Sequence, residues 1–333
     1  MKAPDFWWRP PGLAARLLQP ISAVYGTLAA RRMALPGARA SLPVICIGNV
    51  TVGGSGKTPT AIEVARLLRG MGREPAFLTR GYGGALRGPI LVDPARHGFE
   101  EVGDEPLLLA RHAPTVIARA RPAGAVLAAS TGADVIVMDD GLQNPSLQKD
   151  LTIAVFDGGA GMGNRLVFPA GPLRAPPSAH WPRIGAVLIV GEGEPGRAIA
   201  AEAGASGLPV LHARLEPEPE QAVRLEGRRV LAFAGIGRPE KFFAALRAVG
   251  AEVVETRPLP DHHVYNEREV LDLLADAERG GLVPVTTEKD LVRLVGFRSS
   301  DARAGAIVAL PVKLACADTE RLEALLASAL GRA

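Results

Sequence analysis

The sequence predicts an α/β protein whose central sheet is mostly parallel and is covered by helices on both faces. The first observation behind this prediction is that, from residue 44 onward, short apolar runs of strand length alternate with segments of helical periodicity. Such alternation is typical of sheets in which each strand is followed by a covering helix. The second observation is a glycine-rich stretch at residues 53–56, which stands directly between one such strand and a helical pattern.

The length and composition fit a globular protein with room for two domains. The chain has 333 residues, of which 47% are hydrophobic and 22% are charged. Its net charge of +3 favours an anionic partner, whether a nucleotide, a lipid headgroup or nucleic acid, without choosing among them. Cys46 and Cys316 lie far apart, which argues against a disulfide framework or a regularly spaced metal site and favours the cytoplasm. No apolar run approaches about 18 residues, so no transmembrane helix is expected.

The first expected segment, residues 1–40, is basic and helical. Its apolar residues fall along one helical face, at Leu13, Leu17, Ile21, Val24 and Leu28. Pro20 is expected to kink this helix or to split it in two. One interpretation is an interfacial helix, with arginines on anionic headgroups and tryptophans at the membrane boundary. The other is a helix that packs its apolar face on the core. The pattern alone does not separate them.

The second expected segment, residues 41–220, contains the mostly parallel sheet. Apolar and β-branched runs predict strands at residues 44–47, 75–78, 90–92, 115–118, 135–138, 151–156 and 187–190. Helices are expected after the glycine-rich stretch and at residues 105–111, 122–130 and 197–203. Because ligands of parallel sheets gather at the carboxyl ends of the strands, the functional residues are expected in the loops that follow these strands.

The third expected segment, residues 221–333, is a smaller α/β domain that follows an acidic, proline-rich stretch. Strands are expected at residues 229–234, 252–255, 283–286 and 306–312. Helices are expected at residues 239–249, 267–278, 289–295 and 319–330. Gly235 and Gly237 after the first of these strands are interpreted as a tight turn. A dinucleotide site would need a third glycine at the required spacing.

The glycine-rich stretch has the features of a phosphate-binding P-loop. In such a loop, backbone N–H groups converge on phosphate oxygens, and the N-terminus of the following helix adds its positive dipole. Lys57 would reach the terminal phosphates and Thr58 would ligate Mg²⁺. The usual motif has glycine where this chain has Thr51, so the alternative is a glycine-rich turn without a ligand. The expected nucleotide-binding residues are Val52, Gly53, Gly54, Ser55, Gly56, Lys57 and Thr58.

Several carboxylates occupy positions where a kinase or NTPase needs them. Asp139 and Asp140 end the apolar strand at residues 135–138, where an aspartate can hold Mg²⁺ bound to nucleotide phosphates or can cap a helix. Asp104 and Glu105 stand at an expected helix start. There Asp104 is either an N-cap or a catalytic base that accepts the proton of an attacking hydroxyl.

Arginines and histidines lie in other predicted loops. Arg80 follows a strand and is either a phosphate or substrate clamp or a surface residue. Arg174 follows a proline- and glycine-rich turn, from which an arginine can stabilise a transferred phosphoryl group. His262 and His263 follow Asp261 in a proline-flanked loop. They suggest a metal site without an obvious third ligand, or a histidine that orients a carboxylate base.

Taken together, these residues resemble the tetraacyldisaccharide 4′-kinases, the lipid A 4′-kinases of Gram-negative bacteria. The resemblance covers nearly the whole chain, and the family also has a small hydroxyl residue at the position of Thr51. It rests on seven motifs in the same order: Gly48-Asn49 with Val52-Gly53-Gly54-Ser55-Gly56-Lys57-Thr58-Pro59, Arg80-Gly81-Tyr82, Val102-Gly103-Asp104-Glu105-Pro106, Asp139-Asp140-Gly141-Leu142-Gln143, Pro169-Ala170-Gly171-Pro172-Leu173-Arg174, Asp261-His262-His263 and Thr287-Glu288-Lys289-Asp290.

The resemblance implies two α/β/α domains with the ATP site between them. It further implies a peripheral enzyme on the cytoplasmic side of the inner membrane, which phosphorylates the 4′-hydroxyl of a lipid A disaccharide precursor. By motif, Asp104 is the expected base and His262 the histidine that orients it and tunes its pKa, with His263 as the alternative. Arg174 would stabilise the transition state, and Thr58, Asp139 and Asp140 would hold Mg²⁺. Arg80, Gln143 and His263 are further candidates for contact with substrate or phosphate.

The resemblance also favours an anionic inner-membrane surface as a partner of residues 1–40. No obligate protein partner is expected. The alternative function is a membrane-associated P-loop NTPase switch or metallochaperone, many of which carry a second lysine where this chain has Val52. A nucleic-acid-dependent ATPase is not favoured, because no arginine stripe interleaved with aromatic residues is present.

Overall fold

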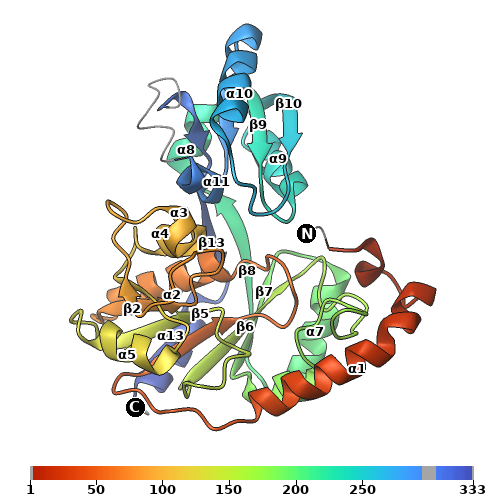
Figure 1. Ribbon diagram of the computed structural model, residues 1–333, viewed down its shortest axis with the longest axis vertical. Coiled ribbons are helices and arrows are strands. Elements are labelled where there is room, and N and C mark those ends of the chain that lie inside the picture. The colour runs from red at the N-terminus through yellow and green to blue at the C-terminus, as the bar shows by residue number, and fades with distance from the viewer. Residues whose placement is uncertain (1–2, 295–304, 332–333) are drawn as a thin grey trace.

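The computed structural model describes residues 3–294 and 305–331. They form two units, each built around its own β-sheet (Figure 1). The large sheet has nine strands in the order β13-β8-β7-β6-β1-β5-β2-β4-β3. Its neighbouring strands are parallel, except that β13 is antiparallel to β8 and β3 to β4. The mostly parallel sheet predicted from the sequence is therefore confirmed.

The large sheet carries helices on both faces, as predicted. Its strands are β1 (Val44–Gly48), β2 (Pro75–Thr79), β3 (Ile90–Leu91), β4 (Thr115–Ile117), β5 (Val135–Asp139), β6 (Leu151–Asp157), β7 (Ala186–Val190), β8 (Val210–Pro217) and β13 (Val312–Cys316). The accompanying helices are α2 (Lys57–Gly70), α3 (Phe99–Val102), α4 (Asp104–Leu109), α5 (Arg121–Ala129), α6 (Pro177–His180), η2 (Trp181–Arg183), α7 (Glu194–Ala205) and α13 (Thr319–Leu330).

Strand β1 shows how the sequence builds this layering. All five of its residues are buried, because alternate side chains point to opposite faces and both faces are covered. Ile45 and Ile47 join the core cluster that contains the apolar residues of α2 and α13. Val44 and Cys46 join the cluster on the other face, with residues of α5. A continuous apolar run was therefore the correct signal for a central strand.

The small unit is also a three-layer arrangement. Its strands are β9 (Arg229–Ala234), β10 (Glu252–Pro258), β11 (Val283–Thr286) and β12 (Val308–Ala309), in the order β10-β9-β11-β12. Its helices are α8 (Pro219–Leu225), α9 (Pro239–Ala248), α10 (Glu267–Gly280) and α11 (Glu288–Arg293). Side chains of α8 and α9 cover one face of the sheet, and side chains of α10 cover the other. The expected helix at residues 289–295 corresponds to α11, and its last expected position, residue 295, lies outside the described residues.

The end of the chain departs from the expected arrangement of residues 221–333. The expected strand at residues 306–312 is two short strands, and the second of them, β13, returns to the large sheet beside β8. Helix α13 follows it, and Leu322 and Leu326 pack in the large core. Strand β8 and helix α8 were not predicted. In β8, charged side chains such as Arg214 interrupt the apolar pattern, and α8 begins inside the proline-rich stretch.

The N-terminal segment consists of the 3-10 helix η1 (Asp5–Trp8) and helix α1 (Leu13–Met33), which runs along the side of the large unit (Figure 1). Pro20 does not split α1, which is continuous across it. The expected apolar face does not pack on the core, because the following side chains are 60–74% exposed: Leu13, Leu17, Ile21, Val24 and Leu28.

Helix α1 instead contacts the protein through its small residues. Ser22 donates a hydrogen bond to the carbonyl of Val167 (2.6 Å), and Gly26 lies close to Pro176. The interfacial interpretation placed the tryptophans at a membrane boundary, but Trp7 is buried, with its indole N–H 3.0 Å from the carbonyl of Pro169. Within the described ranges, no helix combines the length and apolar character needed to cross a bilayer.

Candidate active site

The glycine loop joins the carboxyl end of β1 to the start of α2. Gly56 has φ +92°, a left-handed conformation that strains any residue with a side chain, and it directly precedes the first residue of α2, Lys57. Gly53 and Gly54 are exposed, with no atom near the position that a Cβ would occupy. Fourteen residues of α2 follow the loop. The loop therefore presents an open backbone at the positive end of a helix, the arrangement that binds phosphate.

Asp139 lies at the end of β5, next to the glycine loop. Its Oδ2 is 3.5 Å from the Oγ1 of Thr58, at the outer limit of a hydrogen bond. Its Oδ1 and the buried hydroxyl of Ser55 have no hydrogen-bond partner in the part of the chain that the structure describes. Burial, together with the charge of Glu105, raises the pKa of Asp139 to about 7.

These oxygens fit a magnesium ion. Mg²⁺ takes oxygen ligands and is usually held by one or two protein groups together with phosphates and water. The chain can supply a carboxylate from Asp139 and a hydroxyl from Thr58, and the unpaired Oδ1 of Asp139 gives the carboxylate a reason to bind a cation. Across residues 3–294 and 305–331, no cluster of three His, Cys, Asp or Glu side chains offers a self-contained metal site.

The carboxylate of Asp140 lies between two cations. Arg174 Nη1 is 2.8 and 3.0 Å from its two oxygens, and Lys57 Nζ is 3.6 Å from Oδ1. Burial alone would raise the pKa of Asp140, but the charges of Lys57 and Arg174 outweigh it and hold the pKa below its usual range. Expected as a metal ligand, Asp140 is here engaged by the two basic residues that were expected to contact phosphate.

Arg174 and Gln143 are anchored to the backbone that leads into the glycine loop. Arg174 donates through Nε to the carbonyl of Thr51 (3.1 Å), and Gln143 donates to the carbonyl of Asn49 (2.7 Å). Gln143 Nε2 also lies 3.0 Å from Nε2 of His180, a buried histidine that the sequence analysis did not single out. Burial and the nearby charge of Arg174 lower the pKa of His180 to about 4, so the ring is neutral and can accept from the Gln143 amide.

Asp104 is the first residue of α4 and is only 4% exposed. Its Oδ2 is 3.1 Å from Nδ1 of His262, which comes from the loop before α10 in the small unit. Burial would raise the pKa of Asp104, but the His262 hydrogen bond and the charges of Lys289 and Arg293 hold it well below its usual range. The hydrogen bond to Asp104 in turn raises the pKa of His262.

His263 and Arg80 lie apart from this pair. The Nε2 of His263 is 3.2 Å from both carboxylate oxygens of Glu269, and its ring meets that of Tyr265 edge-on. Of the two histidines, it is therefore His262 that faces Asp104. The side chain of Arg80 is exposed and makes no hydrogen bond or ion pair within the described ranges.

Comparison with known proteins decides the family. The family described as Tetraacyldisaccharide-1-P 4′-kinase matches residues 14–331. The chain belongs to the tetraacyldisaccharide 4′-kinase family. It is similar to curated tetraacyldisaccharide 4′-kinases from Methylobacterium sp. (strain 4-46), at 61% identity over 100% of this chain and 99% of the relative. It is likewise similar to that of Bradyrhizobium sp. (strain ORS 278), at 51% identity over 100% of this chain and 99% of the relative.

A solved structure agrees with this assignment. The "apo" form of LpxK from Aquifex aeolicus in complex with ATP superposes with a TM-score of 0.73, at 25% identity, over 96% of this chain and 100% of that chain. The chain is therefore a kinase, and the P-loop fold predicted from the sequence is confirmed.

Two basic residues of this kinase were missing from the sequence-based site. Both lie on α11 of the small unit and reach α4 of the large unit. Arg293 donates to Asp104 Oδ2 through Nε (2.9 Å) and Nη2, and Lys289 donates to Glu105 (2.6 Å). Lys289 lies in a motif that the family resemblance already used. Arg293 follows it by four residues and so lies on the same helical face, which was the available signal.

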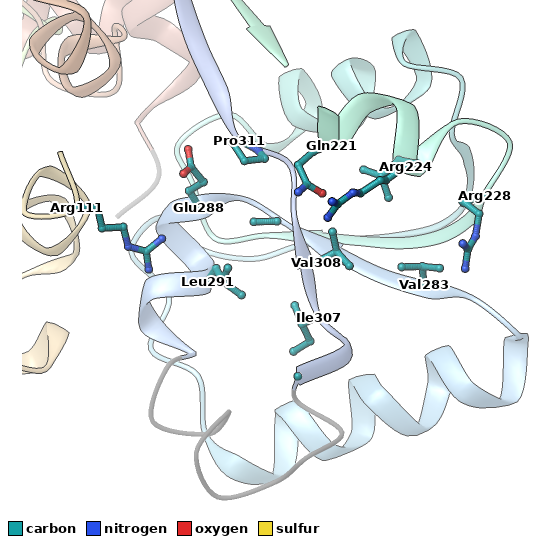
Figure 2. A pocket seen from close by; sticks show the side chains of 13 residues that line it. Arg111, Gln221, Arg224, Arg228, Val283, Glu288, Leu291, Ile307, Val308 and Pro311 are labelled. Carbon is teal, nitrogen blue, oxygen red and sulfur yellow. The ribbon is translucent and has the colours of Figure 1, made fainter. Parts of the chain in front are cut away.

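The Asp104 region and the glycine loop form one electrostatic site in this kinase. The charge of Glu105, next to Asp104, contributes to the raised pKa of Asp139, and the charge of Lys57 helps to lower the pKa of Glu105. A separate cavity of about 720 Å³ is lined by Glu288 and Leu291 of α11 (Figure 2). Arg111, Arg224 and Glu288 line it, but none of the candidate site residues does.

Proposed function

We propose that this kinase transfers the γ-phosphoryl group of ATP to the 4′-hydroxyl of a tetraacylated glucosamine disaccharide, a precursor of lipid A. The observation that carries the proposal is that a carboxylate–histidine pair and a phosphate-binding loop share one electrostatic site. The names of the relatives support the acceptor, and the ATP complex of the Aquifex aeolicus protein supports the donor.

The glycine loop and its neighbours bind the donor. Backbone N–H groups of residues 53–57 hold the phosphates, and Lys57 neutralises charge at the terminal phosphates. Arg174 lies beside the glycine loop, where its Nη1 donates to Asp140 and its Nε donates to the carbonyl of Thr51. Its Nη2 makes no hydrogen bond within the described ranges. That nitrogen is free to donate to the transferred phosphoryl group, where an arginine stabilises the spread negative charge.

Asp104 serves the acceptor. It takes the proton of the 4′-hydroxyl as that oxygen forms its bond to the γ-phosphorus, and the bond from the γ-phosphorus to the bridging oxygen breaks to leave ADP. Because its pKa lies below the usual range, the carboxylate is ionised at neutral pH. His262 orients the carboxylate through Nδ1.

Thr58 and Asp139 are the residues that would hold Mg²⁺. When bound, the ion would neutralise charge on the phosphates of ATP. The unpaired Oδ1 of Asp139 supports this assignment, and the engagement of Asp140 by Lys57 and Arg174 supports a second role for Asp140, as the residue that positions those two cations.

Helix α1 is proposed to bind the anionic cytoplasmic surface of the inner membrane. Its exposed apolar side chains have no partner protein surface among the described residues, and each gains roughly 1.5–3 kcal/mol on leaving water. Arg16, Arg31 and Arg32 are exposed on the same helix and suit anionic headgroups. A lipid acceptor would thus be met at the surface that contains it.

Mass spectrometry of the lipid product tests the function. The purified kinase is incubated with ATP, Mg²⁺ and the lipid A disaccharide precursor in detergent micelles, and Lys57→Met is purified in parallel to exclude a contaminating kinase. We expect a lipid heavier by one phosphate, with fragments that place the phosphate at the 4′ position, and no product with Lys57→Met. ATP hydrolysis without a phosphorylated lipid would contradict the proposal and favour a membrane-associated NTPase switch.

A further inference from the structure

We propose that Arg293, anchored by Asp290, is a positioning residue that fixes Asp104 relative to His262 and leaves Oδ1 of Asp104 as the oxygen that accepts the substrate proton. The inference rests on the proposed function, because it assumes that Asp104 is the base. It assigns roles to two residues of α11 that neither the motifs nor the comparisons assign.

The two oxygens of Asp104 are in different environments. Oδ2 is contacted by three N–H groups: Nε of Arg293 (2.9 Å), Nη2 of Arg293 and Nδ1 of His262 (3.1 Å). Among the described residues, Oδ1 accepts one hydrogen bond, from the backbone N–H of Glu105 (2.8 Å). A carboxylate oxygen has two lone pairs, so Oδ2 is fully used and Oδ1 retains one for an incoming hydroxyl.

Arg293 also fixes the loop that carries His262. Its Nη1 donates to the carbonyl of Gly235 (3.0 Å), and that carbonyl also accepts the backbone N–H of His262 (3.0 Å). His262 has φ +56°, an unfavourable conformation for a residue with a side chain, which persists only where the surroundings hold it. One guanidinium therefore contacts both the base and the backbone atom that fixes its histidine partner.

Asp290 holds the guanidinium in turn. Its Oδ1 accepts from Arg293 Nη1 (2.9 Å), the backbone N–H of Gly235 (3.0 Å) and the hydroxyl of Tyr265 (2.9 Å), and Oδ2 accepts from Thr287 (2.6 Å). Both Asp290 and Arg293 are at most 2% exposed. Only a planar guanidinium has donors spaced to bridge two carboxylates and a carbonyl in this way, so lysine is not an equivalent residue.

The test separates the charge of Arg293 from its geometry. The charged groups that face Asp104 are His262 from its loop, Lys289 and Arg293 from α11, and Glu105 from its own helix. Burial raises the pKa of Asp104 and the charge of Arg293 lowers it. Removing Arg293 should therefore raise the pKa of Asp104, so that it takes up a proton at a higher pH. In Arg293→Met we expect kcat to fall about tenfold or more, with an acid limb of kcat that moves to higher pH and a KM for ATP within about twofold of wild type.

Arg293→Lys is the second variant. Lysine keeps the positive charge but lacks the planar set of guanidinium donors. We therefore expect kcat to stay well below that of the wild type, while the acid limb of kcat stays nearer to the wild-type position. Arg238→Met is the matched control, because it removes another ion pair between the two units, from Arg238 to Asp157 (3.0 Å), without touching Asp104. Its acid limb should not move. Thermal unfolding of every variant verifies the fold.

If Arg293→Met does not fold, Tyr265→Phe is measured instead. It deletes only the hydroxyl that donates to Asp290, and kcat should fall several-fold with an unchanged KM for ATP. Wild-type kcat and an unmoved acid limb in Arg293→Met, or wild-type kcat in Tyr265→Phe, would overturn the inference. Asp104→Asn distinguishes the two levels: wild-type activity in that variant contradicts the proposed function itself, whereas its inactivity beside an active Arg293→Met contradicts only the role of Arg293.

Discussion

At the scale of single residues, the surroundings of Asp104 are organised by buried charges that compensate one another. Asp104 is buried, and an isolated carboxylate there would take up a proton. The charges and hydrogen bonds of Arg293, Lys289 and His262 reverse that tendency. Beside the glycine loop, Lys57 and Arg174 keep Asp140 ionised, whereas the less compensated Asp139 has a raised pKa. The second situation suits a group whose charge partner is a bound cation.

The His262–Asp104 pair predicts a pH dependence of stability. The hydrogen bond to Asp104 raises the pKa of His262 above its ordinary 6.5, so the folded state binds the proton more tightly than the unfolded state. The resulting stability is fully present below about pH 6.5 and is lost as the pH rises through the folded-state pKa. The Tm difference between the wild type and His262→Gln should therefore be larger at about pH 6 than at about pH 9.

The same measurement in an Asp104→Asn background is the control. If the pair is the cause, His262→Gln should have little pH-dependent effect there, because the charged partner is already gone. A Tm difference that is equal at both pH values in the wild-type background would contradict the pairing.

Arg293 and Lys289, which were missing from the sequence-based site, lie far along the sequence from the residues that they contact. Arg293 is 189 positions from Asp104, and Lys289 is 184 positions from Glu105. Local periodicity and motif spacing describe neighbours along the chain and carry no information on how two units dock. Asp104, by contrast, was a candidate from the sequence because it starts a helix, a position that local residue types reveal.

At the scale of elements, α1 is the part of the molecule whose sequence pattern and environment differ most from an ordinary surface helix. A helix that packs on a core hides its apolar stripe, but α1 contacts the protein with Ala15, Ser22 and Gly26 and turns the stripe outward. The helical pattern alone supported both interpretations equally, and the family resemblance favoured the interfacial one. The exposed stripe removes the support for core packing and is the observation on which the proposed membrane contact depends.

Charged substitutions on the α1 stripe test the membrane contact. In Leu17→Asp/Ile21→Asp, both side chains are exposed in the folded protein, so the Tm should change little. Binding to vesicles of anionic phospholipid should fall about tenfold or more, because two apolar side chains are lost and two negative charges are added. Co-sedimentation with the vesicles measures this directly.

Val126→Asp provides the matched control for α1. Val126 is 72% exposed on α5, so the variant also places a charge at an exposed apolar position, away from α1. It should bind vesicles as the wild type does. Unchanged binding of the α1 double variant would contradict the proposed contact, and a large loss of Tm would show that the stripe serves folding.

Elements with uniform patterns were predicted well, and elements with mixed patterns were not. Strand β1, the glycine loop and α2 follow one another in the sequence as an apolar run, a turn and a helical pattern, and each signal is local. Strand β8 lies near the edge of the sheet, where only alternate residues such as Leu211 and Ala213 are buried, and polar neighbours hide the pattern. The position of β13 was unpredictable because strand pairing with β8 is decided by tertiary packing.

At the scale of the whole molecule, the site is assembled from both units. The large unit supplies the glycine loop, Asp139 and Asp104, and the small unit supplies His262 and Arg293. Strands β8 and β13 run side by side between the units and lead into and out of the small one (Figure 1). The sequence predicted two α/β units and most of the candidate residues. It did not predict that an ion pair between the units would join Arg293 to Asp104.

The central claim is that Asp104 accepts the proton of the lipid hydroxyl at a site that binds ATP independently of it. The most direct measurement is the rate of phosphoryl transfer to the lipid by Asp104→Asn, with the Kd for ATP measured on the same preparation. Asparagine keeps the shape of the side chain but cannot act as a base. We predict that kcat falls by about two orders of magnitude or more while the Kd for ATP stays within about twofold. A kcat close to that of the wild type would contradict the account and reduce Asp104 to a structural residue at the start of α4.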